Sequence, residues 1–308
     1  MQNNLILNQK KITTKAGYVA IIGKPNAGKS TFLNSVIGTK LSIITPKPQT
    51  TRKRVLGICT EANIQIIFID TPGVLNPKYA MQSTMMEYVH NSIEIADCII
   101  LIYDVIKFNK IKPISDVLYN FFKKEKKPVI LLLNKIDLLK DSKEVLPLIK
   151  YFYDMNLFSD IIPISALKEK KLNKKILDVI TKYLSESEFF YDADLLSNQP
   201  ERFFVSEIIR ENIFLSYGEE IPYSTEVSII EFKEREYGKW FISAEIIVER
   251  ETQKKIIIGR KAEKLKKVSE LSRKQIEEHL EHSVYLEVFV KVRDNWRDNN
   301  YMLRSLGY

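Results

Sequence analysis

The sequence has 308 residues, 45% of them hydrophobic, which is enough for two ordinary domains that each bury a core. It contains no run of about 18 uncharged apolar residues, and this excludes proteins that cross a membrane as a helix. The formal net charge of +8 supports an acidic partner only weakly, because residues 201–308 hold 19 basic and 20 acidic side chains.

The N-terminal end of the chain is polar. Residues 1–16 lack the apolar core of a signal peptide, and we expect them to form a disordered tail. The two cysteines, Cys59 and Cys98, each lie in an apolar run. They have neither the spacing of a metal site nor a disulfide framework, which fits a protein of the reducing cytoplasm.

From Gly17 to Leu184, short apolar runs alternate with segments of helical pattern. The predicted strands are Tyr18–Ile22, Ile64–Ile69, Cys98–Tyr103, Val129–Leu133 and Ile161–Ile164. They are almost continuously apolar, as strands buried on both faces are. The alternation predicts an α/β domain over residues 17–184 with a mostly parallel sheet, whose ligand lies at the C-terminal ends of the strands.

The first predicted strand leads into a glycine-rich loop that opens a helix. The loop and the start of its helix are Gly23, Lys24, Pro25, Asn26, Ala27, Gly28, Lys29, Ser30 and Thr31. This is the P-loop pattern between a strand and a helix, a context that a chance match in a loop of glycine and lysine would lack. The backbone N–H groups bind phosphates, Lys29 reaches the β- and γ-phosphates, and the Ser30 hydroxyl binds Mg²⁺.

A second motif, Asp70, Thr71, Pro72 and Gly73, follows the strand predicted at Ile64–Ile69. In isolation this motif would be interpreted as a turn. Because it stands at a strand end after a P-loop, we expect Asp70 to hold a Mg²⁺-bound water. We expect Gly73 to donate its N–H to the γ-phosphate.

Two further motifs predict the base site. Asn134, Lys135 and Asp137 follow one strand, and Ser165, Ala166 and Leu167 follow the next. The Asp137 carboxylate can accept two hydrogen bonds from guanine, a pair that adenine does not offer, so the site argues against a P-loop ATPase or kinase. Asn134 and Lys135 brace the loop. Taken alone, Ser165–Leu167 would be an ordinary helix N-cap.

The order of these four motifs is that of GTPases related to translation factors. Between the first two motifs lie Pro48, Gln49, Thr50, Thr51 and Arg52, which resemble the first switch loop of the Era family of bacterial ribosome-assembly GTPases. The resemblance implies that Thr51 is the second hydroxyl on Mg²⁺, beside Ser30 and Asp70, with Thr50 as the alternative. A surface turn after Pro46 and Pro48 is the other interpretation. The catalytic groups are then Lys29, Thr51 and Gly73.

The residue that would orient the attacking water is missing from the second motif. Val74 stands where Ras-like proteins carry glutamine, and valine cannot hydrogen-bond water. We therefore expect slow intrinsic hydrolysis of GTP to GDP, raised by a partner or by a potassium ion. An asparagine at the position of Asn26 helps to hold K⁺ in related GTPases; the other interpretation is that Asn26 only shapes the loop.

After a polar linker over residues 185–200, the pattern changes to that of a small α+β domain over residues 201–308. A helix is predicted first and a longer basic helix later, with two antiparallel strands between them and one strand after. These elements are Glu201–Ser216, Thr225–Phe232, Trp240–Arg250, Lys261–Leu280 and Val284–Val292.

The loop before the long helix resembles the Gly-x-x-Gly loop of a type II KH domain, which clamps the backbone of single-stranded RNA. The residues that this implies for RNA binding are Ile258, Gly259, Arg260, Lys261, Ala262, Lys264, Lys266 and Lys267. Ala262 replaces the second glycine, and its methyl group should weaken RNA binding. Because alanine is tolerable in the first turn of a helix, we do not expect RNA binding to be abolished. The other interpretation is a solvated basic helix after a turn.

The C-terminal end, residues 289–297 and 303–308, closely resembles that of the Era family, so the resemblance covers residues 17–308. We expect Trp296 to be a core residue, with a base-stacking platform as the alternative. The resemblance implies a cytoplasmic monomer that binds the 3′ end of small-subunit ribosomal RNA and the pre-ribosomal small subunit. It also implies peripheral association with the inner face of the cell membrane. A GTP-regulated adaptor for a protein or a membrane surface is the competing function.

Overall fold

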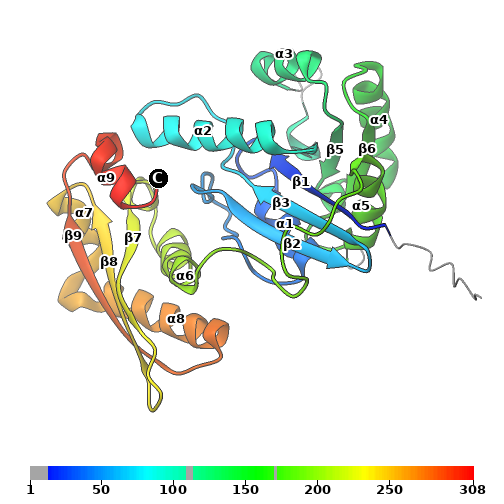
Figure 1. Cartoon of the computed structure of the whole chain (residues 1–308). Coiled ribbons are helices and arrows are strands. Elements are labelled where there is room, and N and C mark those ends of the chain that lie inside the picture. Colours follow the sequence, from blue (N-terminus) through cyan, green and yellow to red (C-terminus); the bar gives the residue numbers. More distant parts are fainter. Residues whose placement is uncertain (1–12, 109–113, 170–171) are drawn as a thin grey trace, which may run out of the picture.

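A computed structural model describes residues 13–108, 114–169 and 172–308 (Figure 1). The predicted tail falls mostly on residues 1–12, which lie outside the described residues. The first strand, β1, begins at Lys15, whose backbone N–H bonds the Asn63 carbonyl. Lys15 and Ala16 therefore belong to the sheet and not to the tail.

The N-terminal part is built on a six-stranded sheet of order β2-β3-β1-β4-β5-β6. The strands are β1 Lys15–Ile22, β2 Val55–Glu61, β3 Ile64–Asp70, β4 Cys98–Asp104, β5 Val129–Asn134 and β6 Asp160–Ile164. All neighbours are parallel except β2, which pairs antiparallel with β3. The sequence did not predict β2, because its mixed composition lacks the continuous apolar run of a central strand.

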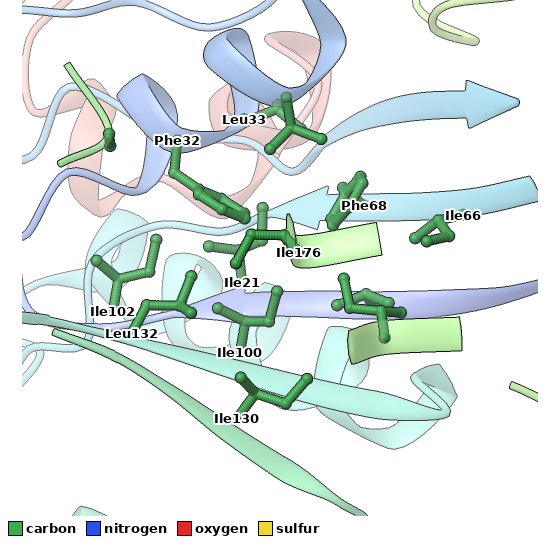
Figure 2. Close-up of a cluster of buried hydrophobic side chains, with 14 of the residues drawn as sticks. Ile21, Phe32, Leu33, Ile66, Phe68, Ile100, Ile102, Ile130, Leu132 and Ile176 are labelled. Carbon is green, nitrogen blue, oxygen red and sulfur yellow. The ribbon is translucent and has the colours of Figure 1, made fainter. Parts of the chain in front are cut away.

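Helices cover both faces of this sheet. They are α1 Lys29–Ile37, α2 Ala80–Ile95, α3 Asp116–Lys124, α4 Val145–Asp154 and α5 Leu172–Ile180. Figure 2 shows the core on one face, where Phe32 of α1 and Ile176 of α5 pack on Ile21 and Phe68. On the other face Phe152 of α4 packs among apolar strand residues. The α/β fold with a mostly parallel sheet is confirmed.

The segment predicted as a linker, residues 185–200, bonds β1 and β3 in its first half and the sheet's outer strand β2 near its end. The Ile58 N–H donates to the Leu196 carbonyl at 2.8 Å, and the Ser197 hydroxyl donates to the Leu56 carbonyl at 2.6 Å. This segment therefore covers the edge of the sheet and fixes where the C-terminal part begins.

The C-terminal part is an α+β domain, as predicted. Its elements are α6 Glu201–Ser216, β7 Glu226–Lys233, β8 Trp240–Val248, α7 Glu251–Ile258, α8 Glu263–Leu280, β9 Val284–Val292 and α9 Asn300–Ser305. The sheet has the order β7-β8-β9, with β7 antiparallel and β9 parallel to β8.

Two boundaries of this domain differ from the prediction by two residues, and one helix was not predicted. Strand β8 ends at Val248, because Oε1 of Gln253 then accepts from the backbone N–H groups of Glu249 and Arg250 and α7 starts. The sequence did not predict α7. The long helix α8 begins at Glu263 and not at Lys261, because Lys261 and Ala262 adopt left-handed backbone conformations.

Trp296 is a core residue, as predicted. It is 0% exposed, and its Nε1 donates to the Ser224 carbonyl at 3.1 Å. It packs with Leu303 of α9 against Met81 and Met85 of α2, so the C-terminal segment is joined to the first domain (Figure 1).

The loop between α1 and β2, residues 38–54, also contacts the second domain. Lys40 forms an ion pair with Glu211 of α6. The ammonium of Lys47 donates to the carbonyls of Phe214 and Tyr217, at the C-terminal end of α6 where a cation is favoured. The α1–β2 loop is thus anchored from outside its own domain.

Candidate functional site

A cavity of about 490 Å³ lies at the C-terminal ends of the parallel strands. It is lined by residues of the P-loop and the α1–β2 loop, by Gly73, and by residues of the loops after β5 and β6. Of the predicted site residues, Gly23, Lys24, Ala27, Asp70, Thr71, Pro72 and Ser165 do not line it. Asp70 and Ser165 instead lie directly behind lining residues, as their hydrogen bonds show.

The P-loop backbone requires glycine at two positions. Gly23 has a φ of +153°, and a Cβ there would lie 2.5 Å from the Ile102 carbonyl oxygen. Gly28 has a φ of +102°, and a Cβ there would lie 2.2 Å from Nδ2 of Asn134. With Gly28 as its N-cap, α1 begins at Lys29 and presents its N-terminus, a site for anions, to the cavity.

Lys29 is a buried ammonium without an anionic partner. Its Nζ donates to the carbonyls of Gly23 at 3.4 Å and Lys24 at 3.2 Å, and it forms no ion pair with any described residue. Burial lowers the pKa of Lys29 to about 8, although the nearby Asp70 charge opposes the shift. A phosphate group would supply the negative charge that this side chain lacks.

Three oxygen-bearing side chains meet beside Lys29. The Ser30 hydroxyl lies 2.8 Å from Oγ1 of Thr51 and donates to Oδ2 of Asp70 at 2.8 Å, and Thr51 donates to the same oxygen at 3.4 Å. Asp70 is fully buried, burial raises its pKa, and its Oδ1 has no hydrogen-bond partner among the described residues.

A buried carboxylate with a free oxygen beside two hydroxyls suits Mg²⁺, which binds few protein oxygens and keeps several waters and phosphate oxygens. The residues present therefore fit the ion. Thr51, and not Thr50, is the threonine that meets Ser30 and Asp70. The described ranges contain no cluster of three or more His, Cys, Asp or Glu residues that would form a different metal centre.

The loop after β5 is tied to the P-loop by two side chains. Asn134 donates from Nδ2 to the Ala27 carbonyl at 2.8 Å and accepts from the Ala166 N–H at 3.0 Å. Lys135 donates to the Asn26 carbonyl at 2.8 Å. Asn134 therefore joins three loops of the cavity, and both side chains brace the site.

Asp137 lines the far end of the cavity. Its Oδ1 accepts a hydrogen bond from the Ser165 hydroxyl at 2.7 Å, and Lys168 lies 3.6 Å from Oδ2. Leu138 and Leu167 form exposed apolar walls, 59% and 75% exposed. A fixed carboxylate between apolar surfaces can recognise the edge of a flat base.

Two residues bear on the hydrolysis step. The Asn26 amide donates to the Pro46 carbonyl at 2.6 Å and the residue has a φ of +62°, so its side chain shapes the contact between the P-loop and the α1–β2 loop. Val74 is half-buried, and its backbone N–H donates to the Gly23 carbonyl at 3.0 Å.

Sequence reasoning missed Asp104 and the segment 43–46. Oδ2 of Asp104 accepts a hydrogen bond from Lys135 at 2.8 Å and thereby orients a base-site residue. An acid at the end of the strand was the available signal, as it was for Asp70. Residues 43–46 line the cavity, and in the sequence Pro46 marked only a turn.

The loop between α7 and α8 has an unusual backbone. Gly259 has a φ of 72° and a ψ of 179°, Lys261 a φ of 48°, and Ala262 a φ of 60° and a ψ of 18°. The expectation that Ala262 sits in the first turn of a helix is wrong. It is the N-cap of α8 in a left-handed conformation, which keeps the backbone that a glycine would adopt at the cost of strain.

The residues predicted to bind RNA lie at the end of α7, in the following loop and in the first turns of α8. Ile258 and Gly259 are half-buried, and Ala262 is exposed. The exposed cations are Arg260, Lys261, Lys264, Lys266 and Lys267. Within the described parts of the chain none of these cations forms an ion pair, so their charge is available to a polyanion.

Comparisons with known proteins match both parts of the chain to family models. Residues 18–135 match the family model of the 50S ribosome-binding GTPase, and residues 220–297 match that of the KH domain. The chain is 40% identical over 300 residues to the GTPase Era of Clostridium kluyveri, which covers 96% of this chain and 99% of that protein. It is 42% identical to a chloroplastic GTPase ERA-like protein of Oryza sativa subsp. japonica, covering 96% of this chain and 69% of that protein.

Two solved structures resemble the whole chain. One is Era in complex with MgGDPNP and nucleotides 1506–1542 of 16S ribosomal RNA, and the other is a point variant of Aquifex aeolicus Era bound to GDP.AlF4⁻. Each has a TM-score of 0.91 and 42% sequence identity, and covers 96% of this chain and 99% of that chain.

Proposed function

The chain belongs to the Era family of GTPases, and from this premise we propose that it is a Mg²⁺-dependent GTP switch that binds the 3′ end of small-subunit ribosomal RNA. In this proposal residues 17–184 bind and hydrolyse GTP, and residues 201–308 bind RNA and assist maturation of the small ribosomal subunit. Residues 185–200 join the two parts. The protein acts in the cytoplasm, where that subunit is assembled.

One observation carries the nucleotide half of the proposal. A single cavity has the buried Lys29 and the Ser30–Thr51–Asp70 cluster at one end and the Asp137 carboxylate at the other. The first end suits a magnesium-bound triphosphate, and the second suits guanine.

The proposed mechanism assigns a task to each residue. Lys29 and the backbone N–H groups after Gly23 bind the β- and γ-phosphates, and the N–H of Gly73 holds the γ-phosphate. Ser30 and Thr51 would hold Mg²⁺ through their hydroxyls, with Asp70 behind them, and the ion, when bound, would supply positive charge beside the phosphate oxygens. Val74 cannot orient water, so we expect slow turnover without a partner.

The RNA half rests on the α7–α8 loop. Its exposed cations form no ion pairs within the described residues, and the loop precedes a helix as in the KH family. An Era structure that resembles the whole chain contains 16S ribosomal RNA. We propose the same partner for this chain, with Arg260 and Lys261 on the phosphates.

Three subsidiary predictions accompany the proposal. K⁺ accelerates hydrolysis relative to Na⁺ if Asn26 helps to hold the ion; equal rates would leave Asn26 the role of shaping the loop.

The protein is a monomer, which sedimentation tests. It associates peripherally with membranes, which vesicle flotation tests; no helix among the described residues is long and apolar enough to cross a membrane.

The decisive experiment is a titration with a short single-stranded RNA that matches the 3′ end of small-subunit ribosomal RNA. The protein carries either a non-hydrolysable GTP analogue or GDP, at fixed salt, and a scrambled RNA serves as control. The proposal predicts tighter, sequence-dependent binding with the GTP analogue. Equal binding of both RNAs in both nucleotide states would contradict it, and no RNA binding in either state would favour the GTP-regulated adaptor.

A further inference from the structure

Helix α6 of the second domain carries an arginine that reaches the α1–β2 loop. Arg210 is 1% exposed, and its Nη2 donates to the Thr50 carbonyl at 2.6 Å. The two residues are separated by most of the first domain in sequence. A buried, positively charged donor on a carbonyl is among the stronger hydrogen bonds in proteins.

The guanidinium is held in a fixed orientation. Glu207, one turn earlier on α6, accepts from Nε at 2.7 Å and from Nη2 at 2.6 Å in a two-pronged pair. The ring of Phe214, one turn later, lies 5.5 Å from the guanidinium carbon. Because α6 itself fixes the group, the position of the Thr50 carbonyl is set by the second domain.

The next residue after Thr50 is the predicted magnesium ligand Thr51, which meets Ser30 at 2.8 Å. The residue after that, Arg52, is buried and donates to the carbonyls of Pro222 and Thr225 and to the carboxylate of Glu226. Thr51 therefore stands between two residues that are both anchored to the second domain.

We propose that Arg210 is a positioning residue for GTP hydrolysis: through the Thr50 carbonyl it holds the Thr51 hydroxyl at the metal position beside Ser30 and Asp70. This inference rests on the proposed role of Thr51. In this arrangement the metal site of the first domain is complete only when the RNA-binding domain lies against that domain. A shift of α6 would therefore move groups at the γ-phosphate end of the cavity.

The chemistry of Arg210 favours this role over that of a simple domain contact. Burying a guanidinium is expensive, and a packed apolar side chain would join two domains at least as well. The nearby pair of Lys40 and Glu211 joins the same loop to the same helix, but the Lys40 side chain is 53% exposed and lies well before Thr51. Among the contacts of the described residues between this loop and α6, only that of Arg210 ends on the peptide next to the predicted ligand.

The test uses the full chain with Arg210→Met, made alone and together with Glu207→Gln so that no buried carboxylate loses its partner. Single-turnover GTP hydrolysis is measured against Mg²⁺ concentration, with GDP affinity and RNA affinity as controls. We expect kcat to fall about 10-fold and the Mg²⁺ requirement to rise several-fold, with GDP and RNA affinity changed less than about 2-fold. Lys40→Met is the matched control and should change none of these by more than about 2-fold.

A double-mutant cycle with Thr51→Ala tests whether Arg210 affects hydrolysis through Thr51. If Arg210 acts through Thr51, adding Arg210→Met to Thr51→Ala causes no further loss of kcat. Additive losses, or an equal loss in the Lys40→Met protein, would overturn the inference. If Thr51→Ala itself leaves hydrolysis and its Mg²⁺ requirement unchanged while Arg210→Met impairs them, the proposed metal ligand is wrong and so is this route.

Arg210→Met can also prevent folding, which a loss of GDP binding would reveal. In that case Glu207→Gln alone makes the same test, because it removes the carboxylate that orients the Arg210 guanidinium and leaves the positive charge of Arg210 in place. We then expect about a 3-fold loss of kcat that disappears in the Thr51→Ala background. A Glu207→Gln protein with unchanged kcat would contradict the inference.

Discussion

Two loops of this molecule precede a helix and are predicted to bind phosphate groups, yet the fold holds them differently. In the P-loop two of the three positive-φ positions are glycines, Gly23 and Gly28, the third being Asn26, and Asn134 and Lys135 bond to the loop from a neighbouring loop. In the loop of residues 259–262, two of the three positive-φ positions are Lys261 and Ala262. Residues 260–262 of that loop are exposed, and α8, like α1, begins without a side-chain cap.

This difference separates two ways of binding an anion. The P-loop is a preformed cradle, in which glycine avoids strain at two of the three positive-φ positions and the donors are fixed before the ligand arrives. The α7–α8 loop stores about 1–2 kcal/mol of strain at each left-handed alanine or lysine and relies on exposed charge. Changes to the first loop should therefore abolish binding, whereas changes to the second should tune it.

The largest effect is expected from Gly28→Ala. The new Cβ would lie 2.2 Å from Nδ2 of Asn134 and would push away the side chain that joins three loops of the cavity. We expect GTP and GDP affinity to fall about 100-fold or more, as measured by titration calorimetry. Gly38→Ala is the matched control, because Gly38 also has a positive φ, +80°, but nothing lies within 4 Å of its Cβ. It should cost about 1 kcal/mol of stability and leave nucleotide affinity unchanged.

Asp137→Asn should have the next largest effect, at the base end of the same cavity. The amide cannot accept both hydrogen bonds from guanine, so GTP affinity should fall about 100-fold. Affinity for xanthosine triphosphate, whose base presents a carbonyl in place of the exocyclic amine, should rise. Asp141→Asn, an exposed acid in the following loop, is the control. Retention of GTP selectivity in the Asp137→Asn protein would mean that the base is read elsewhere.

The same comparison explains what the sequence could predict. The P-loop, Asp70–Gly73 and Asn134–Asp137 were predicted because each motif is contiguous and follows an apolar strand. The contacts of Arg210 with Thr50 and of Glu226 with Arg52 were not predicted, because the two partners of each contact lie about one domain apart in sequence. Nothing in the local sequence of a charged helix or strand marks such a contact. Helix α7 and the dihedrals of Ala262 were also missed. No element was predicted between Arg250 and Lys261, and Ala262 was expected in the first turn of a helix that in fact begins at Glu263.

Arg260→Ala should have a smaller effect, confined to RNA. Removing one exposed cation from the loop should weaken binding of the ribosomal RNA 3′ end about 3- to 10-fold and lower the slope of log affinity against log salt by about 1. GTP affinity should not change. Lys274→Ala is the control, because Lys274 is also exposed on α8 but lies further from the loop. A larger loss with Lys274→Ala would move the RNA surface to the middle of the helix.

The smallest effect, and the sharpest test of the comparison, is expected from Ala262→Gly. Alanine at a φ of 60° is strained by about 1–2 kcal/mol, and glycine removes that strain but gives the unfolded chain about 0.4–1 kcal/mol of additional freedom. The free energy of unfolding should therefore rise by about 1 kcal/mol or less, measured by urea denaturation.

Ala262→Gly should also tighten RNA binding about 2- to 5-fold, because without the methyl group the phosphate backbone can approach the loop more closely. Ala62→Gly is the matched control, since Ala62 has a φ of 51° in the β2–β3 turn of the first domain. It should give a similar gain in stability and no change in RNA affinity. If both variants gain stability but neither binds RNA more tightly, Ala262 is only a strained helix cap, and the exposed cations alone set the affinity. If Ala262→Gly loses stability while Ala62→Gly gains it, the alanine makes contacts that outweigh its strain, and the loop is held more like the P-loop than we propose.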